Sequence, residues 1–218
     1  MRRYAYYPVF LDLQGRRCVV IGGGHIAQRK VTTLLSCGAH VTVISPAVTP
    51  RLAAYAKQSK IRHVQRRLRS NDLQGAWLIY AATDEQTINQ LVARAGLRRR
   101  IFTNVVDQPD LCSFITPAIM QRGAVTVAIS TGGASPVMAK KIRNTVARAI
   151  RREDVAMVQL LASLRPLTKA QLQQPQARKR YFERLIAGKT YALVRAGLLK
   201  PARREARELL QQRASSAS

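Results

Sequence analysis

Short hydrophobic runs alternate with amphipathic stretches along the first half of the chain. β-Branched runs at 17–21 and 40–45 flank a glycine turn and a segment from Ile26 to Cys37, which ends at Gly38. Short apolar runs bounded by turn residues are typical of buried strands, and the segment between them has the length of a helix. The pattern therefore predicts a βαβ unit.

The same alternation continues to about residue 106. The further elements predicted are a helix at 49–58, a short strand near 61–65, a strand in the apolar run 76–83, a helix at about 85–95 and a strand at 101–106. Strands that alternate with helices favour a parallel, doubly wound Rossmann-like sheet with right-handed connections. The predicted fold class of this part is α/β.

The alternation ends after Asp107. Two prolines interrupt the segment QPDLCSFITPAIMQRG, and a strand is predicted at 124–130. Ser135 and Pro136 then match the N-cap and the first position of a long basic helix. The pattern stays helical to about residue 212, with breaks expected near Pro166, Pro175 and Pro201. The second half is therefore expected to be a short segment followed by a helical domain.

The turn after the first strand has the spacing G-x-G-x-x-A at Gly22, Gly24 and Ala27. The first glycine permits a tight turn, the second lets the backbone approach a pyrophosphate, and the helix N-terminus presents N–H groups to the phosphates. An ordinary strand-to-helix turn is the alternative, but its place in a βαβ unit favours a dinucleotide site. Ser45 and Pro46 stand where an acidic residue is expected after the second strand, so NAD and NADP both stay open.

Two aspartates follow predicted strands at the edge where such sheets bind ligands. Asp84 precedes the next predicted helix, so we interpret it as an N-cap. No helix begins after Asp107, which lies close to Asn104 in sequence, and we interpret it as functional. Lys30 and Arg29, one turn into the first helix, are either solvated side chains or anion contacts.

Charge is the strongest compositional anomaly. The 218 residues include 37 Lys and Arg against 11 Asp and Glu, a formal net charge of +26. Nucleic acid, a generally basic solvated surface and a polycarboxylate substrate would each account for it. The arginine clusters are scattered, with few aromatic residues between them and no helix-turn-helix or RNP pattern. Nucleic acid therefore remains an alternative only.

Cysteine and histidine usage points to neither disulfides nor a resident metal. The three cysteines are scattered and odd in number, which fits a reducing cytoplasm, and the three histidines lack ligand spacing. No apolar run approaches the ~18 residues of a membrane span, and the first residues lack the apolar core of a signal peptide. No tyrosine has a lysine four residues later, which disfavours a short-chain reductase. A cytoplasmic protein without a membrane segment is expected.

Four stretches together resemble a known family. They are YYPVFLDLQGRRCVVIGGGHIAQRK, AATDEQTIN, NVVDQPDLCSFITPA and VAISTGGASPVMAKKIR. Their order and spacing over residues 4–150 resemble the siroheme synthase amino-terminal region, that is, precorrin-2 dehydrogenase with sirohydrochlorin ferrochelatase. The helical stretch to about residue 212 also fits this family in length.

The resemblance implies a Rossmann domain that binds NAD (1–113), a dimerisation segment (114–150), a helical C-terminal domain (151–218) and a homodimer. It implies oxidation of the tetrapyrrole precorrin-2 to sirohydrochlorin with NAD as hydride acceptor, and in bifunctional members insertion of ferrous iron as a second activity. The alternatives are a dehydrogenase without chelatase activity, a basic nucleic-acid-binding protein and an NAD-sensing protein on a Rossmann-like core.

Carried over residue by residue, the resemblance places the catalytic aspartate on Asp107. Cofactor contacts are expected at Gly22, Gly23, Gly24, His25, Ile26, Pro46, Ala47 and Thr83. Substrate contacts are expected at Asn104, Ser113, Ser130 and Thr131, the last of which stands where some relatives carry a phosphorylated serine. Precorrin-2 carries eight carboxylates, so a crevice lined with arginine and lysine suits it.

Overall fold

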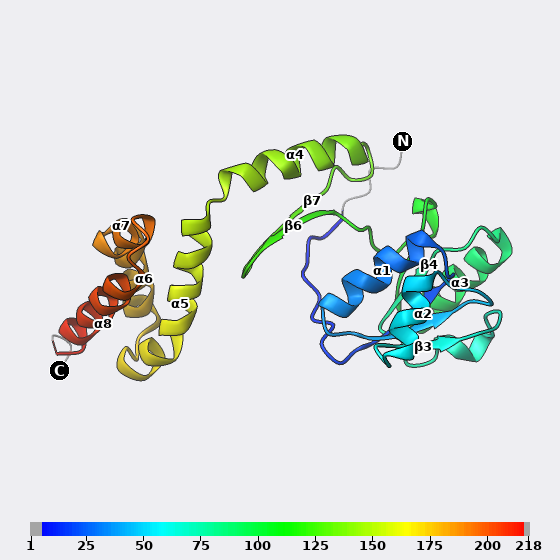
Figure 1. Cartoon of the computed structure of the whole chain (residues 1–218), viewed down its shortest axis with the longest axis horizontal. Helices are drawn as coiled ribbons and strands as arrows, with labels where there is room; N and C mark the ends of the chain where they lie inside the picture. The colour runs from blue at the N-terminus through cyan, green and yellow to red at the C-terminus, as the bar shows by residue number, and fades with distance from the viewer. Residues whose placement is uncertain (1–5, 216–218) are drawn as a thin grey trace. The chain divides into compact units, whose positions relative to one another are not determined.

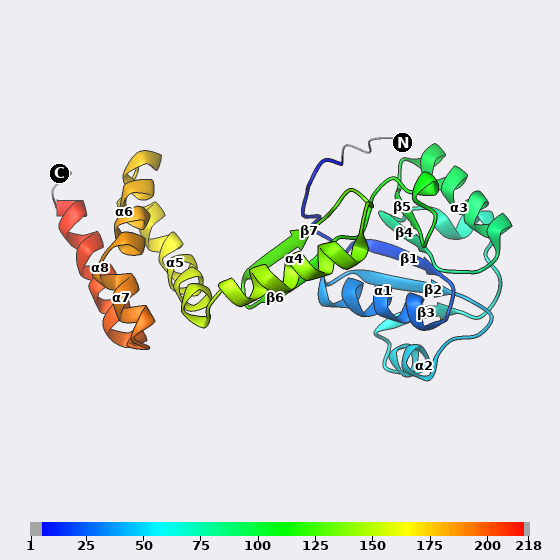
Figure 2. The same cartoon turned by 90° about the horizontal axis from the view of Figure 1, so that it is seen from above.

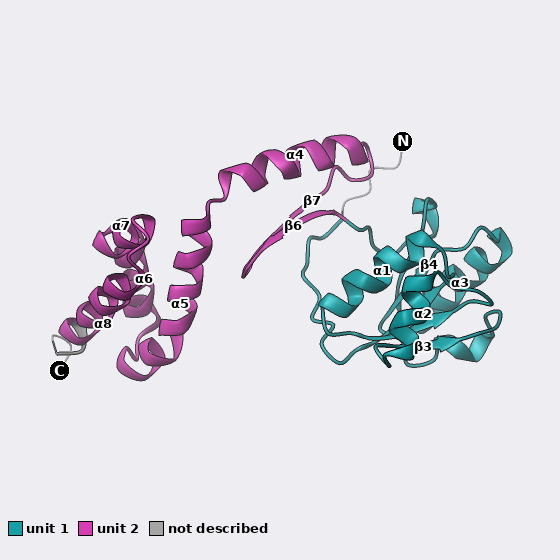
Figure 3. Cartoon of the chain, viewed as in Figure 1, with its two compact units in different colours: residues 1–116 teal, residues 117–218 magenta. Residues whose placement is uncertain are grey.

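The chain forms two compact units, residues 1–116 and 117–218 (Figure 3). The structure, a computed structural model, describes the backbone of residues 6–215 and the side chains of residues 6–212. Each unit has a hydrophobic core of its own, so the two are described separately. The three-part division expected from the sequence, with boundaries at 113/114 and 150/151, stays a prediction.

The first unit is built on a five-stranded parallel sheet with the order β3-β2-β1-β4-β5. Its strands are β1 (Arg17–Ile21), β2 (His40–Ile44), β3 (Ile61–Val64), β4 (Leu78–Ala81) and β5 (Phe102–Val105). The strand order reverses direction at β1 and β4, which pair with Val20 opposite Tyr80. The predicted doubly wound Rossmann-like sheet is confirmed, and ligands bind such sheets at this reversal.

Helices cover both faces of the sheet. α1 (His25–Ser36) and α2 (Pro50–Lys57) lie on one face, and α3 (Gln86–Arg99) lies on the other, as Figures 1 and 2 show. Two short 3₁₀ helices, η1 (Ser70–Leu73) and η2 (Pro109–Leu111), precede β4 and follow β5. The sheet is therefore buried on both sides, which explains why its strands are continuous apolar runs.

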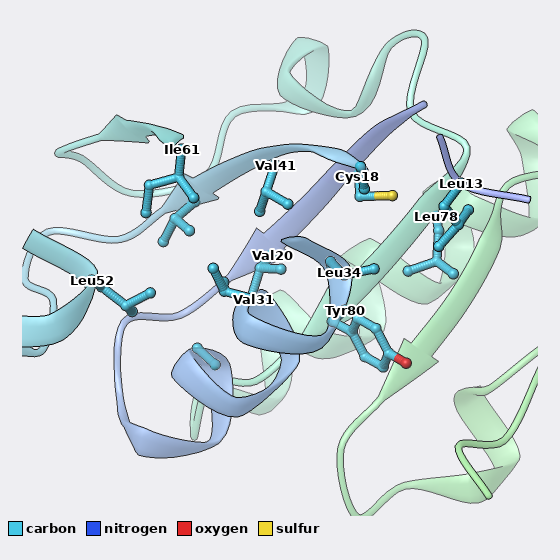
Figure 4. Packing of buried hydrophobic residues seen from close by; sticks show 13 residues of the cluster. Leu13, Cys18, Val20, Val31, Leu34, Val41, Leu52, Ile61, Leu78 and Tyr80 are labelled. Carbon is cyan, nitrogen blue, oxygen red and sulfur yellow. The ribbon is translucent and has the colours of Figure 1, made fainter. Parts of the chain in front are cut away.

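Alternate side chains of each strand enter different cores. On the α1 side, Val20 and Val41 of the sheet pack with Val31 of α1 and Leu52 of α2 (Figure 4). On the α3 side, Val19, Ile79 and Val105 pack with Val92 of α3. This division follows from the two-residue period of a strand, which points successive side chains to opposite faces.

The second unit begins with an antiparallel hairpin of β6 (Ala118–Arg122) and β7 (Val125–Ile129). α4 (Pro136–Ala149) packs on this hairpin, and the Ser135 hydroxyl accepts a hydrogen bond from the Met138 backbone N–H as the predicted N-cap. β6 was not predicted from the sequence, and its side chains are only half-buried or exposed. The long basic helix predicted from Pro136 ends at Ala149, and the backbone turns extended at Ile150.

Four helices complete the second unit around a separate core. They are α5 (Arg152–Gln171), α6 (Pro175–Ala187), α7 (Lys189–Arg195) and α8 (Leu199–Ser215). Tyr181 is fully buried among them and donates its hydroxyl to the Ala206 carbonyl oxygen over 2.7 Å, and burial raises the pKa of this phenol to about 12. None of the helices in the described part of the chain is long and apolar enough to cross a membrane.

The predicted break at Pro166 is wrong, because α5 runs through this residue. Proline removes one backbone donor and usually kinks or ends a helix. Here Leu160 and Leu164 on the preceding turns are buried in the core of the second unit. Packing of this face therefore keeps the helix continuous, while Pro175 stands at the first position of α6 as a helix start.

The core of the first unit gives a matched pair of stability predictions. Leu52 is 0% exposed on α2, whereas Leu97 is 81% exposed on α3. We expect Leu52→Ala to lower the free energy of unfolding by about 2–5 kcal/mol, since it leaves a cavity. Leu97→Ala should change it by no more than about 0.5 kcal/mol. Urea denaturation of both variants measures the difference, and equal destabilisation would contradict this core assignment.

Candidate dinucleotide and catalytic site

Three loops leave the carboxyl edge of the sheet side by side. The backbone N–H of Gly22 donates to Ile44, that of Ala82 donates to Ile21, and that of Val106 donates to Ala81, over 2.8–3.0 Å. These bonds continue the sheet pattern one residue beyond each strand. The loops after β1, β4 and β5 therefore begin at one edge of the sheet, and they contain several of the residues predicted to contact the cofactor and the predicted catalytic Asp107.

Gly22 and Gly23 hold this edge together because neither has room for a side chain. A Cβ on Gly22 would lie 2.1 Å from the Ala82 carbonyl oxygen, and the residue has a φ of +109°. A Cβ on Gly23 would lie 1.9 Å from the carbonyl oxygen of Ala47. The glycine turn thus contacts the loops after β2 and β4 directly through its backbone, which only glycine allows.

At Gly24, neither the backbone conformation nor the surrounding protein atoms require glycine. Its φ is −78°, which any residue adopts, and a Cβ placed there would meet no protein atom within 4 Å. It is the N-cap of α1 without a side-chain cap, and the first turn contains no acidic residue. The first helical N–H that bonds within the helix is that of Gln28, to Gly24 over 2.9 Å. Gly24 thus combines open space with a helix start whose first N–H groups have no intrahelical partner, which fits a diphosphate.

His25 and Ile26 form the first turn of α1, and both are exposed. Their backbone N–H groups are among those that lack an intrahelical partner, and such groups favour anions at a helix N-terminus. This placement supports backbone rather than side-chain contacts at these two positions. Their assignment to the cofactor stays a prediction.

The loop after β2 lies against the glycine turn. The Thr49 N–H donates to the Gly23 carbonyl oxygen over 2.9 Å, and the Ser45 hydroxyl donates to Ala47 over 2.7 Å. Pro46 and Ala47 are thereby placed beside Gly23, and their contact with the cofactor stays a prediction. Ser45, which stands at the usual position of an acidic residue, uses its hydroxyl to shape this loop.

The loop after β4 is fastened by a residue that the sequence analysis did not select. Asn89 is buried on α3 and donates its side-chain amide to the Thr83 carbonyl oxygen over 3.1 Å. The Thr83 hydroxyl in turn accepts a hydrogen bond from the Glu85 N–H over 3.1 Å. Asp84 is exposed and is not the N-cap of α3, so the N-cap interpretation is wrong: Thr83 makes the local turn and Glu85 is the cap residue.

Asp107 follows β5 in a left-handed backbone conformation with a φ of +60°. Its carboxylate is exposed, and it makes no hydrogen bond or ion pair with the described residues. The Cys112 thiol holds the turn around it, since its sulfur accepts from the Val105 N–H over 3.2 Å and lies 3.3 Å from the Gln108 carbonyl oxygen. Burial raises the pKa of this thiol. Asp107 is thus presented to solvent at the sheet edge by a fixed loop.

Asn104 on β5 and Ser113 on the segment that follows Asp107 are both engaged within the protein. Asn104 is 8% exposed and donates its amide to the Phe114 carbonyl oxygen over 3.0 Å. The Ser113 hydroxyl accepts from the Thr103 N–H over 2.8 Å, and the Ser113 N–H donates to the Thr103 carbonyl oxygen over 2.8 Å. Both residues position the segment that follows β5, and their predicted substrate contacts stay predictions.

Ser130 and Thr131 belong to the second unit, in the turn between β7 and α4. The Ser130 hydroxyl accepts from the Gly132 N–H over 3.0 Å, and the Thr131 hydroxyl accepts from the Ser135 N–H over 3.1 Å. Both hydroxyls therefore stabilise the glycine-containing turn before α4. Their assignment to the substrate also stays a prediction.

Consecutive segments of the chain match three family profiles. Residues 9–118 match a family described as putative NAD(P)-binding, residues 122–153 match the central part of sirohaem biosynthesis proteins, and residues 156–210 match the sirohaem synthase dimerisation region. The chain belongs to the siroheme synthase amino-terminal family. This confirms the resemblance found in the sequence, and the NAD(P)-binding profile agrees with the predicted cofactor.

Individual members of the siroheme synthase family are similar over most of this chain. The siroheme synthase of Thioalkalivibrio sulfidiphilus is 38% identical over 206 residues, 94% of this chain and 42% of that protein. That of Methylococcus capsulatus is 40% identical over 199 residues, 91% of this chain and 42% of that protein. The chain thus spans about two fifths of the length of these curated relatives.

A solved structure extends the likeness to the whole fold. The structure of SirC, a precorrin-2 dehydrogenase, matches with a TM-score of 0.78 and 26% identity, and the match covers 95% of this chain and 100% of that one. Both units of this siroheme synthase family member therefore have counterparts in one solved protein.

Two residues of the site, Asn89 and Cys112, were not predicted from the sequence. Asn89 carried a signal, because it stands at a buried position of α3 with Val92 and Gly96, at helical spacing where an apolar residue is expected. A polar residue at such a position needs a partner. Cys112 had no comparable signal, since its contacts depend on the fold of the loop. Within the described residues, no group of three or more His, Cys, Asp or Glu side chains could hold a metal ion.

Substitutions at the neighbouring residues Gly23 and Gly24 should have opposite effects on folding and on NAD binding. In Gly24→Val the added Cβ enters open space, so the protein should still fold. The side chain should displace the phosphate from the helix N-terminus and weaken NAD binding about 10- to 100-fold, the scale of one or two charge-assisted hydrogen bonds. Calorimetric NAD titration measures this.

Gly23→Ala is the contrasting variant. Its Cβ overlaps the Ala47 carbonyl oxygen, so this change should lower the melting temperature even without NAD. Parental NAD affinity in a folded Gly24→Val protein would place the dinucleotide elsewhere.

Proposed function

We propose that this chain oxidises precorrin-2 to sirohydrochlorin with NAD as hydride acceptor. The observation that carries the proposal is the likeness over both units to SirC, together with an exposed aspartate at the same edge of the sheet as the glycine turn. The reaction removes a hydride and a proton from the macrocycle, so it needs an acceptor for each. The site offers a dinucleotide cradle and an exposed carboxylate at one edge of the sheet.

The residues present fit NAD at the carboxyl edge. The helix start at Gly24, His25 and Ile26 would hold the diphosphate, with Pro46 and Ala47 on one side and Thr83 on the other. When bound, NAD supplies the hydride acceptor. Because Ser45 replaces the acidic residue that normally reads the ribose, we assign NAD on the family resemblance.

Asp107 is the proton acceptor in this proposal. It stands at the end of β5, next in the sheet to β4, and its left-handed backbone turn presents the carboxylate away from the core. The engaged Asn104 and Ser113 keep the following loop in place, so the carboxylate stays at the edge. A carboxylate within reach of the macrocycle can take the proton lost as the hydride leaves.

Further parts of the proposal rest on the family. Insertion of ferrous iron, as a substrate, is the second activity that bifunctional members would have, and Asp107 could receive the pyrrole protons there as well. The profile at 156–210 supports a homodimer. The three cysteines are free thiols, which fits the reducing cytoplasm.

Asp107→Asn tests the catalytic assignment. Asparagine keeps the shape and tolerates a left-handed backbone as well as aspartate does, so folding and NAD affinity should be parental. The turnover number with precorrin-2 should fall about 100-fold or more, the usual scale of a lost general base. NADH formation followed by absorbance measures it.

Asp110→Asn, an exposed aspartate of the same loop, is the control and should keep parental turnover. If Asp107→Asn oxidises precorrin-2 at the parental rate, this carboxylate is not the base. NAD binding without any turnover by the parental protein would favour an NAD sensor over an enzyme.

The net charge of +26 predicts a salt dependence. Long-range attraction between this charge and an octacarboxylate substrate is screened as the Debye length falls from about 10 Å at 0.1 M to about 3 Å at 1 M salt. The KM for precorrin-2 should therefore rise with NaCl. A salt-independent KM would show that the charge excess serves another purpose.

A further inference from the structure

Lys30 and Arg29 are neighbours on α1 but differ in exposure and in contacts. Arg29 is exposed, whereas Lys30 is half-buried. The Lys30 ammonium donates to the Thr116 hydroxyl over 3.2 Å and lies 4.7 Å from the centre of the Tyr80 ring. The Tyr80 and Thr116 hydroxyls are 3.0 Å apart, so they form one small polar cluster with the ammonium.

This cluster borders the proposed catalytic edge. Tyr80 of β4 pairs with Asn104 of β5, and Asn104 bonds to Phe114, two residues before Thr116. The Asp107 charge has a minor influence on the pKa of Lys30, and the two form no ion pair. Lys30 thus lies on the same face of β4 and β5 as Asn104, one of the residues predicted to contact the substrate.

The positive charge of the Lys30 ammonium is not neutralised by a carboxylate of the described residues. Its contacts are a hydroxyl and an aromatic ring, both neutral, and within residues 6–212 no salt bridge joins it to a carboxylate. Burial, and secondarily the charge of Arg29, lower the pKa of Lys30, while Cys112 and Asp107 act in the opposite direction. A lysine ammonium has three donors, and only one of them is used here. A half-buried cation with two free donors is suited to an anion brought by a ligand.

We propose that Lys30 is a substrate-binding residue, whose ammonium, held by Thr116 and Tyr80, pairs with a side-chain carboxylate of the tetrapyrrole. The inference rests on the proposed function and adds a specific contact to it. Pairing there would hold the macrocycle on the β4–β5 side of the site, where Asp107 faces it. The aromatic ring and the hydroxyl fix the ammonium in advance, so little side-chain freedom is lost on binding.

A purely structural role is the competing explanation, and the chain contains a control for it. Lys60 also lies over a tyrosine, 5.9 Å from the centre of the Tyr55 ring, but it is exposed and belongs to the turn before β3. Lys60→Met removes a similar cation–π contact far from the β4–β5 edge in the sheet order. Both lysine variants keep an unbranched side chain of similar length over the ring.

The experiment compares Lys30→Met, Lys30→Arg and Lys60→Met in the full chain. Lys30→Met should raise the KM for precorrin-2 about 10- to 100-fold, the scale of a lost charge-assisted hydrogen bond, with unchanged NAD affinity and melting temperature. Lys30→Arg should recover most of the affinity, because the positive charge is kept. Lys60→Met should match the parental protein in every measurement.

Binding without turnover separates this inference from the proposed reaction. Uroporphyrin, an octacarboxylate tetrapyrrole, is titrated by fluorescence quenching, and Lys30→Met should weaken its binding by the same factor. If the parental protein binds uroporphyrin through Lys30 but does not oxidise precorrin-2, the dehydrogenase proposal fails and the carboxylate contact stands. Unchanged KM and uroporphyrin affinity in Lys30→Met would overturn the contact. A loss of NAD affinity and thermal stability of similar size would assign Lys30 a structural role instead.

Discussion

The site depends on one steric constraint, the close backbone contact between the turn after β1 and the loops after β2 and β4. Gly22 and Gly23 bring the turn after β1 within contact of the Ala82 and Ala47 carbonyl oxygens, at distances where no Cβ fits. Because the loops after β2 and β4 are thereby fixed to the start of α1, the cradle around the open space at Gly24 is built before any ligand arrives. A preformed cradle of this kind reduces the ordering cost of binding a dinucleotide.

Polar side chains around this edge are mostly used to hold backbone in place. Ser45 shapes the loop after β2, Asn89 fastens Thr83, and Cys112 holds the turn that carries Asp107. The side-chain oxygen of Asn89 is itself buried without a hydrogen-bond partner among the described residues. Because these side chains are bonded to the backbone, a ligand can use the polar groups that make no such bond. Those groups include one negative and one positive charge.

The Asp107 carboxylate supplies a negative charge at the site, and the Lys30 ammonium supplies a positive one. Asp107 is held in a left-handed conformation that costs about 1–2 kcal/mol for an L-residue and less for aspartate, whose side chain tolerates it. The surrounding hydrogen bonds to Val105 and Gln108 offset this cost. Lys30 is fixed by neutral partners instead. A negative group to take a proton and a positive group to take a carboxylate suit a substrate that is itself an acidic macrocycle.

The sequence by itself determined the parallel sheet, the glycine turn and the aspartate after β5, because strand and helix periods and turn residues are local properties. The predicted fold and family are confirmed, while the individual site residues stay predictions. Only the tertiary structure decided that Gly24 faces open space, that Asp84 caps nothing and that Pro166 lies inside a helix. It also separated Lys30 from Arg29, which are equivalent in the pattern. These distinctions depend on what packs against each residue from distant parts of the chain, and periodicity along a single helix or strand carries no information about that.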